Sequence, residues 1–441
     1  MVIEQERIGK TGLVERAVNL HRDNSLAVVL GYIDHIERDI DVEHLALAPF
    51  LDRSSAAKLP SHVAYNGIIG EGGEERVDIM IIDGPNERCY GLRYGHFFFH
   101  SVLNSFVVSA AAKTKQLVGS AMNISRLNFA HLPTPIETLP RLSETLGGPR
   151  LLIKRDDQTG LAFGGNKTRK LEFLVAEARD QGAKTLISGG ALQSNHCRQT
   201  AAAAARFGFK CILVLTGDMP EQPSANLLLD QLFGAQVVHV ADRKDRDRIL
   251  QETFDRAAET GMKPYLVPYG GSSPTGALGY AFAGKELMEQ NVQADWIVFA
   301  TSSGGTHAGL VLGQRVFGGN GKVLGISIDE SEDWLRTHVS ELATSASEKL
   351  GKRIEFTPAE VLVNADYCKA GYGVLSEAER EAIHLFAKYE GLLLDPVYTG
   401  RAVAGMIDLI RKGFFKKDET LLFLHTGGQP ALFADKYANK I

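Results

Sequence analysis

One lysine, Lys167, follows a glycine turn in the segment FGGNKTRKLEF, residues 163–173. It opens a stretch whose apolar positions are spaced for one buried face of a helix. Burial near the start of a helix disfavours the ammonium form of a lysine, and this makes the amine a better nucleophile and Schiff-base former. The alternative is that Lys167 is one of several surface lysines, because Lys170 lies only three residues further on.

A second segment, TSSGGTHAG (residues 301–309), offers a place for a phosphate. Free N–H groups at a helix start, with small hydroxyl residues beside them, form a cradle for an anion. The spacing matches neither a nucleoside-triphosphate loop nor a dinucleotide fold, so a single phosphate monoester suits it better. The predicted contacts are Ser303, Gly304, Gly305 and Thr306. A lysine for an imine and a cradle for one phosphate together predict pyridoxal phosphate as the cofactor.

Both segments belong to a set of four Gly- and Ser-rich turns, each just after a strand-like run. The turns are SGGALQSNH (188–196), YGGSSPTG (269–276), TSSGGTHAG (301–309) and HTGGQPA (425–431). Ligands bind at the carboxyl ends of the strands in open α/β sheets, so four such turns predict one small-molecule cleft. For any single turn, the alternative is that glycine merely tightens a strand-to-helix connection.

The elements that must position these turns come from the regular part of the chain, after about residue 122. Short aliphatic runs alternate there with longer helical stretches, and this alternation predicts an α/β fold with mostly parallel strands. Right-handed crossovers then place helices on both faces of the sheet. The first 121 residues are less regular and carry no motif with recognisable chemistry.

Composition excludes several classes of protein. The 441 residues are 44% hydrophobic with a formal charge of -5, and no Lys- or Arg-rich stretch suggests a nucleic-acid partner. The four cysteines show no C-x-x-C pairing, which argues against structural zinc or a disulfide framework and favours a reducing, cytoplasmic compartment. The most apolar stretch, residues 97–112, is shorter than the ~20 residues of a membrane span. Charges at the N-terminus argue against a signal peptide.

Five motifs in the region from Met122 to the C-terminus resemble, in order, those of the D-cysteine desulfhydrase and 1-aminocyclopropane-1-carboxylate deaminase family. They are FGGNKTRKLEF, SGGALQSNHCRQTAAAAARFG, GTHAGL, LLLDPVYTGRAVAGM and HTGGQPALFA. The family consists of fold-type II pyridoxal-phosphate enzymes of the tryptophan-synthase β-subunit type. The resemblance therefore implies two open twisted sheets with helices on both faces, preceded here by an irregular N-terminal extension.

The resemblance also implies roles for single residues. Lys167 would bind the cofactor covalently, and either Asn166 or Asn195 would contact its ring hydroxyl. Tyr372 and Tyr398 would face the substrate, although both are equally explained as core aromatics.

Ser194 begins the helix that follows the turn at 188–196, next to Gln193 and Asn195. A helix N-terminus attracts anions, so these three residues are the predicted seat of the substrate carboxylate. The alternative is that Ser194 is only a helix cap. The histidines near the turns are better explained by packing than by catalysis; they are His196, His307 and His425. Arg198 and Arg401 are candidate contacts for an anionic leaving group, and the alternative is that both are structural residues of their helices.

Two positions suggest which reaction the site performs. The deaminase branch would have glutamate at position 399 and leucine at 426, whereas Thr399 and Thr426 stand here and resemble the desulfhydrase branch. A threonine hydroxyl near the pyridine nitrogen leaves the ring a weaker electron sink than a carboxylate would. Expelling a thiolate demands less of the ring than opening a cyclopropane, so the prediction is β-elimination from D-cysteine to pyruvate, hydrogen sulfide and ammonia.

Several alternatives stay open at this point. Sister activities would act on L-cysteate, D-serine, 3-chloro-alanine or 1-aminocyclopropane-1-carboxylate, and a non-catalytic protein would bind the cofactor only. Lys167 is the default base for the α-proton. For a D-amino acid, Ser194, Tyr372 or Tyr398 would be placed better if the proton lies on the opposite face.

The predicted organisation is an extension at 1–121 and a catalytic region at 122–441. A small subdomain at about 165–280 would be inserted in a large one made of 122–164 and 281–441, with the cofactor between them. The extension is either an appended domain or upstream sequence included by too early a start codon, and its irregular pattern favours the second interpretation. A chain beginning at Met122 is then expected to be as active. The expected partners are a small amino-acid substrate and a second copy of the chain in a homodimer, with no nucleic acid and no membrane.

Overall fold

The computed structural model describes residues 14–19, 62–69, 75–83, 88–94 and 124–441. The chain divides into two compact units, Met1–Ala121 and Met122–Ile441. The apolar stretch at 97–112 lies outside the described residues. Among the residues that are described, no helix has the length and apolar character that crossing a membrane requires.

The first unit contains a regular element that the sequence analysis did not assign. Its described residues form an antiparallel sheet in the order β1-β2-β3-β4. The strands are β1 (Val14–Asn19), β2 (His62–Ile69), β3 (Glu75–Asp83) and β4 (Arg88–Tyr94).

The second unit is built on two sheets, which confirms the predicted α/β fold. The larger sheet has the order β13-β12-β11-β14-β6-β5, and only β5 runs antiparallel to its neighbour. Its strands are β5 (Ile136–Thr138), β6 (Arg150–Lys154), β11 (Trp296–Thr301), β12 (Lys322–Ser327), β13 (Leu362–Asn364) and β14 (Thr420–Leu424).

The smaller sheet is parallel throughout, in the order β10-β7-β8-β9. Its strands are β7 (Thr185–Ala191), β8 (Lys210–Thr216), β9 (Gln236–Val240) and β10 (Pro264–Leu266). Strands β7 and β8 are both buried along nearly their whole length, and the apolar run CILVL of β8 is typical of such a strand.

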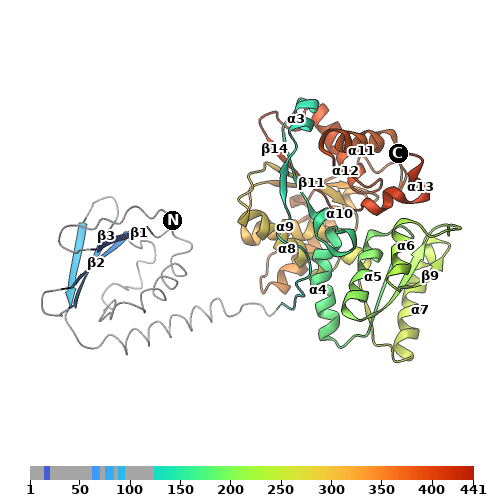
Figure 1. Ribbon diagram of the computed structural model, residues 1–441, viewed down its shortest axis with the longest axis horizontal. Helices are drawn as coiled ribbons and strands as arrows, with labels where there is room; N and C mark the ends of the chain where they lie inside the picture. The colour runs from blue at the N-terminus through green and yellow to red at the C-terminus, as the bar shows by residue number, and fades with distance from the viewer. Residues whose placement is uncertain (1–13, 20–61, 70–74, 84–87, 95–123) are drawn as a thin grey trace. The chain divides into compact units, whose positions relative to one another are not determined.

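Helices cover both faces of each sheet, as predicted. On the larger sheet, α3, α11 and α12 pack on one face and α8 and α9 on the other. On the smaller sheet, α4 and α5 cover one face and α7 the other. Figure 1 shows α5, α6 and α7 gathered around the smaller sheet, while α11 and α12 lie together on the larger one. The helices are α3 (Pro140–Leu146), α4 (Asn166–Asp180), α5 (Asn195–Phe207), α6 (Ala225–Leu232), α7 (Arg246–Glu259), α8 (Pro274–Glu289), α9 (Gly305–Phe317), α10 (Glu332–Lys349), α11 (Glu377–Glu390), α12 (Thr399–Arg411) and α13 (Asp435–Ala438).

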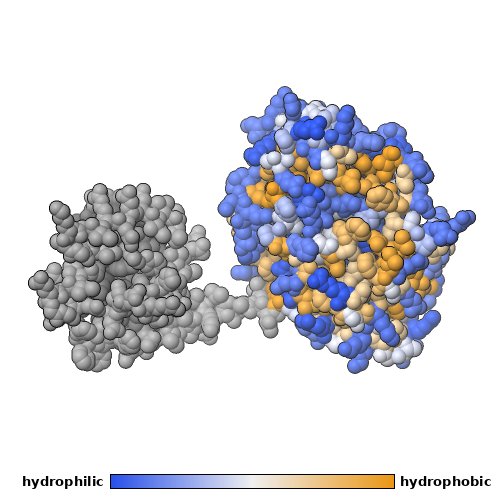
Figure 2. Space-filling model, viewed as in Figure 1, coloured by the Kyte–Doolittle hydropathy of each residue, from blue (hydrophilic) through white to orange (hydrophobic). Residues whose placement is uncertain are grey.

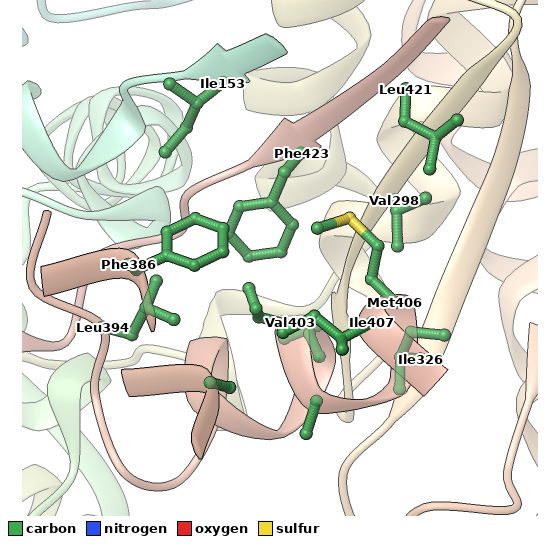
Figure 3. Packing of buried hydrophobic residues seen from close by; sticks show 14 of the residues in the cluster. Ile153, Val298, Ile326, Phe386, Leu394, Val403, Met406, Ile407, Leu421 and Phe423 are labelled. Atoms are coloured by element: carbon green, nitrogen blue, oxygen red, sulfur yellow. The ribbon is translucent and has the colours of Figure 1, made fainter. Parts of the chain in front are cut away.

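The core of the larger sheet holds α12 in place. Val403 and Met406 of this helix are fully buried against the sheet, beside Phe386 of α11 and Phe423 of β14 (Figure 3). The rings of Phe386 and Phe423 meet edge to face, with centroids 5.9 Å apart. This packing positions the start of α12, and hence Tyr398 immediately before it.

A few large apolar side chains stay at the surface of the second unit. Phe163, Leu232 and Phe433 are each more than three-fifths exposed. Figure 2 shows apolar residues gathered on the visible face of this unit among hydrophilic ones. Exposed apolar groups are a feature of contact surfaces, but no partner chain is described, and the homodimer stays a prediction.

Candidate active site

Residues from all four glycine-rich turns line one pocket with an empty volume of about 620 Å³, part of it open to solvent. The turns follow β7, β10, β11 and β14, so the prediction that they meet at one cleft is confirmed. The lining residues are Asn166, Lys167, Ser194, Asn195, His196, Tyr269, Gly270, Ala300, Thr301, Ser302, Ser303, Gly304, Thr306, Tyr398, Thr426 and Gly427.

Lys167 stands in the first turn of α4 and lines the pocket. The glycine turn before it is required, because Gly165 has a φ of 122° and a Cβ there would lie 3.0 Å from the carbonyl oxygen of Thr426. The Lys167 amine donates a hydrogen bond to the carbonyl of Gly270, at 3.0 Å. Burial lowers the pKa of this amine to about 8, against a smaller opposing effect of Cys197. About a tenth of the amine is therefore neutral and nucleophilic at pH 7, far more than for an ordinary lysine.

Lys170 lies beside Lys167 in the structure, although the sequence analysis did not predict it as a site residue. Its side chain is fully buried, and its amine donates to the same carbonyl of Gly270, at 3.1 Å. Burial and the neighbouring charge of Lys167 hold its pKa well below the usual value. The signal was available in the sequence, since residues three apart share one face of a helix.

The turn that leads into α9 has the features of an anion cradle. Gly304 adopts a left-handed conformation with φ 77°, and no side chain caps the N-terminus of α9. A Cβ on Gly305 would lie 2.9 Å from the amine of Lys170, so both a cation and the start of a helix face this turn. The Ser303 hydroxyl lies 2.8 Å from that of Ser272, and Thr306 accepts a hydrogen bond from the Asn166 amide at 3.0 Å.

The start of α5 forms another wall of the pocket. Ser194 caps this helix, with its hydroxyl oxygen accepting from the amide of Cys197 at 3.2 Å, and Asn195 also lines the pocket. Gln193 does not line it, because its side-chain amide is bonded to the backbone of Ser224 and Asn226. Ser194 can therefore cap the helix and also contact a ligand. Gln193 instead fixes the loop through its bonds to the backbone.

Two tyrosines from the second half of the chain, Tyr398 and Tyr372, lie at or beside the pocket. Tyr398 lines the pocket, and its hydroxyl lies 2.8 Å from that of Tyr372, which stands behind it. Burial raises the pKa of both hydroxyls, so both stay protonated and able to donate. A third tyrosine, Tyr269, was missed, although it begins one of the four predicted turns.

The two threonines that suggested a branch of the family differ in their placement. Thr426 lines the pocket. Thr399 is fully buried outside the lining, and its hydroxyl donates to the Asp395 carboxylate at 2.7 Å. Thr399 therefore has no free hydrogen for a ligand, which corrects its predicted place among the cofactor contacts. No aspartate or glutamate is found among the residues that line the pocket in the described part of the chain.

The three histidines near the turns are buried; His196 and His425 form hydrogen bonds, whereas neither ring nitrogen of His307 has a partner among the described residues. His425 is bonded on both ring nitrogens to backbone groups, at 3.0 and 3.1 Å. The Ser188 hydroxyl donates to the Val267 carbonyl, so Nε2 of His196 must be the donor to Ser188, at 2.9 Å. Burial lowers the pKa of His307 to about 3.

Arg198 and Arg401, the candidate contacts for an anionic leaving group, are held in bonds to the protein itself. Arg198 bonds to the carbonyl of Gly164 at 2.9 Å and to Asn226 at 3.0 Å. Arg401 pairs with Glu379 and binds the carbonyls of Gly371 and Val374, which holds the loop that carries Tyr372.

Comparison with known proteins decides the family. Residues 127–427 match the family model described as "Pyridoxal-phosphate dependent enzyme". The chain belongs to this family. This pyridoxal-phosphate-dependent enzyme is also similar to a solved structure titled "Crystal Structure Analysis of the ACC deaminase homologue". The two are 37% identical with a TM-score of 0.66, over 73% of this chain and 96% of the other.

The residues of the pocket fit the cofactor of this family. The Lys167 amine, with its lowered pKa, is suited to bind an aldehyde, and Lys170 with the uncapped start of α9 is suited to hold a phosphate. When bound, pyridoxal phosphate supplies an electron sink for a carbanion at the α-carbon of an amino acid.

The lowered pKa of Lys167 predicts how the cofactor-free enzyme takes up pyridoxal phosphate. Only the neutral amine attacks the aldehyde, so the rate of uptake should rise with pH and level off above a midpoint of about 8. The growth of visible absorbance after mixing, followed between pH 6.5 and 10, measures this rate. A midpoint near the ordinary lysine value of 10.5 would show that the amine is not desolvated.

Proposed function

We propose that the enzyme catalyses β-elimination from D-cysteine, giving pyruvate, hydrogen sulfide and ammonia with the consumption of one water. The observation that carries the proposal is the position of the Lys167 amine. It lines a single pocket together with the start of α5 and the uncapped turn before α9. One amino acid and one phosphate-bearing cofactor can be held there together.

The substrate carboxylate is assigned to the start of α5. The backbone N–H groups and the dipole of a helix start favour an anion, and Ser194 and Asn195 supply polar side chains beside them. The side-chain oxygen of Asn195 is occupied by Asn226 at 2.9 Å, which directs its NH₂ group elsewhere. Asn195 therefore acts as a donor, and this suits a carboxylate.

Proton transfer is assigned to Lys167 on one side and to the tyrosines on the other. The Lys167 amine is the general base in its neutral form, which its lowered pKa favours. The hydroxyls of Tyr372 and Tyr398 share one hydrogen between them, and the other hydrogen remains free to donate. The raised pKa of both hydroxyls keeps that free hydrogen in place for a substrate atom.

The polar groups of the pocket favour elimination of a thiolate over the opening of a cyclopropane. Within the described residues, no carboxylate lines the pocket to hold the cofactor's ring nitrogen protonated, and the uncharged Thr426 stands there. Loss of a thiolate requires less electron withdrawal than the opening of a cyclopropane. In the reaction, the Cα–H and Cβ–S bonds break. The sulfur leaves with the bonding pair and takes a proton to become hydrogen sulfide, and water then replaces the nitrogen to give pyruvate and ammonia.

Deamination of 1-aminocyclopropane-1-carboxylate is the second candidate. One observation favours it: the similar solved structure is named a homologue of that deaminase.

The proposal predicts a ranking of substrates for the cofactor-loaded enzyme. Pyruvate release from D-cysteine should exceed both pyruvate release from L-cysteate and 2-oxobutyrate release from 1-aminocyclopropane-1-carboxylate, by about tenfold or more in kcat/KM. Each oxo acid is measured by coupled reduction, and hydrogen sulfide is measured separately. D-Serine and 3-chloro-D-alanine serve as controls for the leaving group. Faster release from 1-aminocyclopropane-1-carboxylate would establish the second candidate instead.

A further inference from the structure

An aspartate near the pocket lacks a bonding partner. The side chain of Asp329, just beyond the end of β12, is 6% exposed. Neither of its carboxylate oxygens has a hydrogen-bond partner among the residues described. A buried carboxylate without a partner is costly, so its surroundings must offer a cation.

Arg243 is the cation that Asp329 faces. Its Nη2 lies 3.9 Å from Oδ2 of Asp329, about 1 Å beyond a charge-assisted hydrogen bond. The arginine side chain is 57% exposed and therefore free to move toward the carboxylate. Glu330, the next residue, is also within reach of this charge: burial and the charge of Asp329 raise the pKa of Glu330, and Arg243 opposes this only in part.

The two residues belong to different sheets. Arg243 follows β9 of the smaller sheet, whereas Asp329 follows β12 of the larger one. An ion pair between them therefore joins the two halves of the second unit. The same guanidinium lies 5.9 Å from the ring centre of Tyr372. Arg246, one turn further on, lies 4.5 Å from the ring centre of Tyr269.

We propose that Arg243 and Asp329 are a positioning pair that closes the pocket mouth and holds Tyr372 against Tyr398. Closing the 3.9 Å gap gives the aspartate its missing partner and links the smaller sheet to the larger one. The guanidinium then presses on the ring of Tyr372, whose hydroxyl is bonded to that of Tyr398. The pair touches no reacting atom and acts through these tyrosines. Only the role of these tyrosines in turnover depends on the proposed function; the closure by the pair does not.

Access of a small reagent to the bound cofactor tests the closure without any substrate. Hydroxylamine removes the visible absorbance of enzyme-bound pyridoxal phosphate at a rate that reports how often the mouth is open. Arg243→Gln and Asp329→Asn should each raise this rate about tenfold, and the double variant should raise it no further, because both remove one interaction. In the wild type the rate should increase with salt, and in the variants it should not.

Matched controls change the same charges beside the pair. Lys244→Gln and Glu330→Gln should leave the hydroxylamine rate within about twofold of wild type. Arg243→Lys, which keeps the charge, should restore most of the closure. If Asp329→Asn fails to fold, the Arg243 variants and the salt dependence decide alone. Wild-type rates in Arg243→Gln, or additive effects in the double variant, would overturn the proposal.

Turnover gives a second, separable readout. Arg243→Gln should lower kcat for D-cysteine about tenfold with little change in KM, because the substrate carboxylate is bound elsewhere. Should D-cysteine not be turned over by the wild type, the proposed function fails while the hydroxylamine result still tests the pair. A change in KM alone would contradict the positioning role.

Discussion

Replacement of Lys167 by alanine is expected to remove the visible absorbance of the bound cofactor and to lower turnover by a factor on the order of 10⁴ or more. The amine of Lys167 lines the pocket, and its lowered pKa makes it both the group that binds an aldehyde and the group that accepts the α-proton. Alanine can do neither. Absorbance spectra of the purified variant with added pyridoxal phosphate, and oxo-acid release from D-cysteine, measure the two losses.

Lys170 makes this experiment sharper, because its amine shares the Gly270 carbonyl with that of Lys167. If some colour remains in Lys167→Ala, the double variant with Lys170→Ala shows whether the second lysine has taken over. Lys184→Ala, at an exposed position, controls for the loss of a lysine as such. A Lys167→Ala enzyme that keeps both its colour and its turnover would refute the assignment.

The sequence was sufficient for the architecture of the second unit. The strands β8 and β11 are buried over nearly their whole length, and this is why CILVL and WIVFA read as unbroken apolar segments. The glycine-rich turns were also predictable as a set, since parallel strands end at the same edge of a sheet. The topology brings them together in two pairs, after β7 and β10 of the smaller sheet and after β11 and β14 of the larger one, and the packing of the two sheets joins the pairs in one pocket.

The direction in which single side chains point could not be predicted from the sequence pattern. Thr399 and Gln193 were predicted to face a ligand. In the structure, the Thr399 hydroxyl is bonded to Asp395 and the Gln193 amide oxygen to Asn226, and residue spacing does not predict such contacts. Tyr269 went unnoticed because its place in the pocket depends on how the smaller sheet meets the larger one. The same holds for Arg243, whose partner lies in another sheet.

Arg169 lies two residues beyond Lys167 and anchors α4 through buried ion pairs. Its guanidinium donates to the Asp156 carboxylate at 2.8 Å and to Glu286 at 2.8 and 2.9 Å, and the arginine and aspartate are almost completely buried. Lys154 and Tyr280 complete this cluster, bonded to Glu286 and Asp156 respectively. The charges of the two carboxylates and of the two basic side chains balance in this cluster. Removing Arg169 therefore leaves one buried negative charge without a partner.

Arg169→Met should therefore lower the free energy of unfolding by about 3–5 kcal/mol, the range found when one partner of a buried ion pair is removed. Methionine keeps much of the volume, so the loss reports charge more than cavity. Urea titrations followed by circular dichroism measure it. Arg248→Met is the matched control: this arginine forms two exposed ion pairs on α7 and should change stability by less than about 1 kcal/mol. Equal losses in both variants would show that the buried cluster contributes no more than the surface.

The pH dependence of that loss separates charge from packing. Burial alone would raise the pKa of Asp156, but Arg169, with smaller contributions from Lys154 and Tyr280, outweighs burial, and the pKa lies below its usual value. The stability from this carboxylate is thus present above the unfolded-state pKa and is lost as the pH falls through the folded-state pKa. Without Arg169, burial is no longer outweighed, and Asp156 can take up a proton at higher pH than in the wild type. The difference in stability between wild type and Arg169→Met should therefore narrow as the pH falls from 7 toward 4, whereas a packing defect would cost the same at both values.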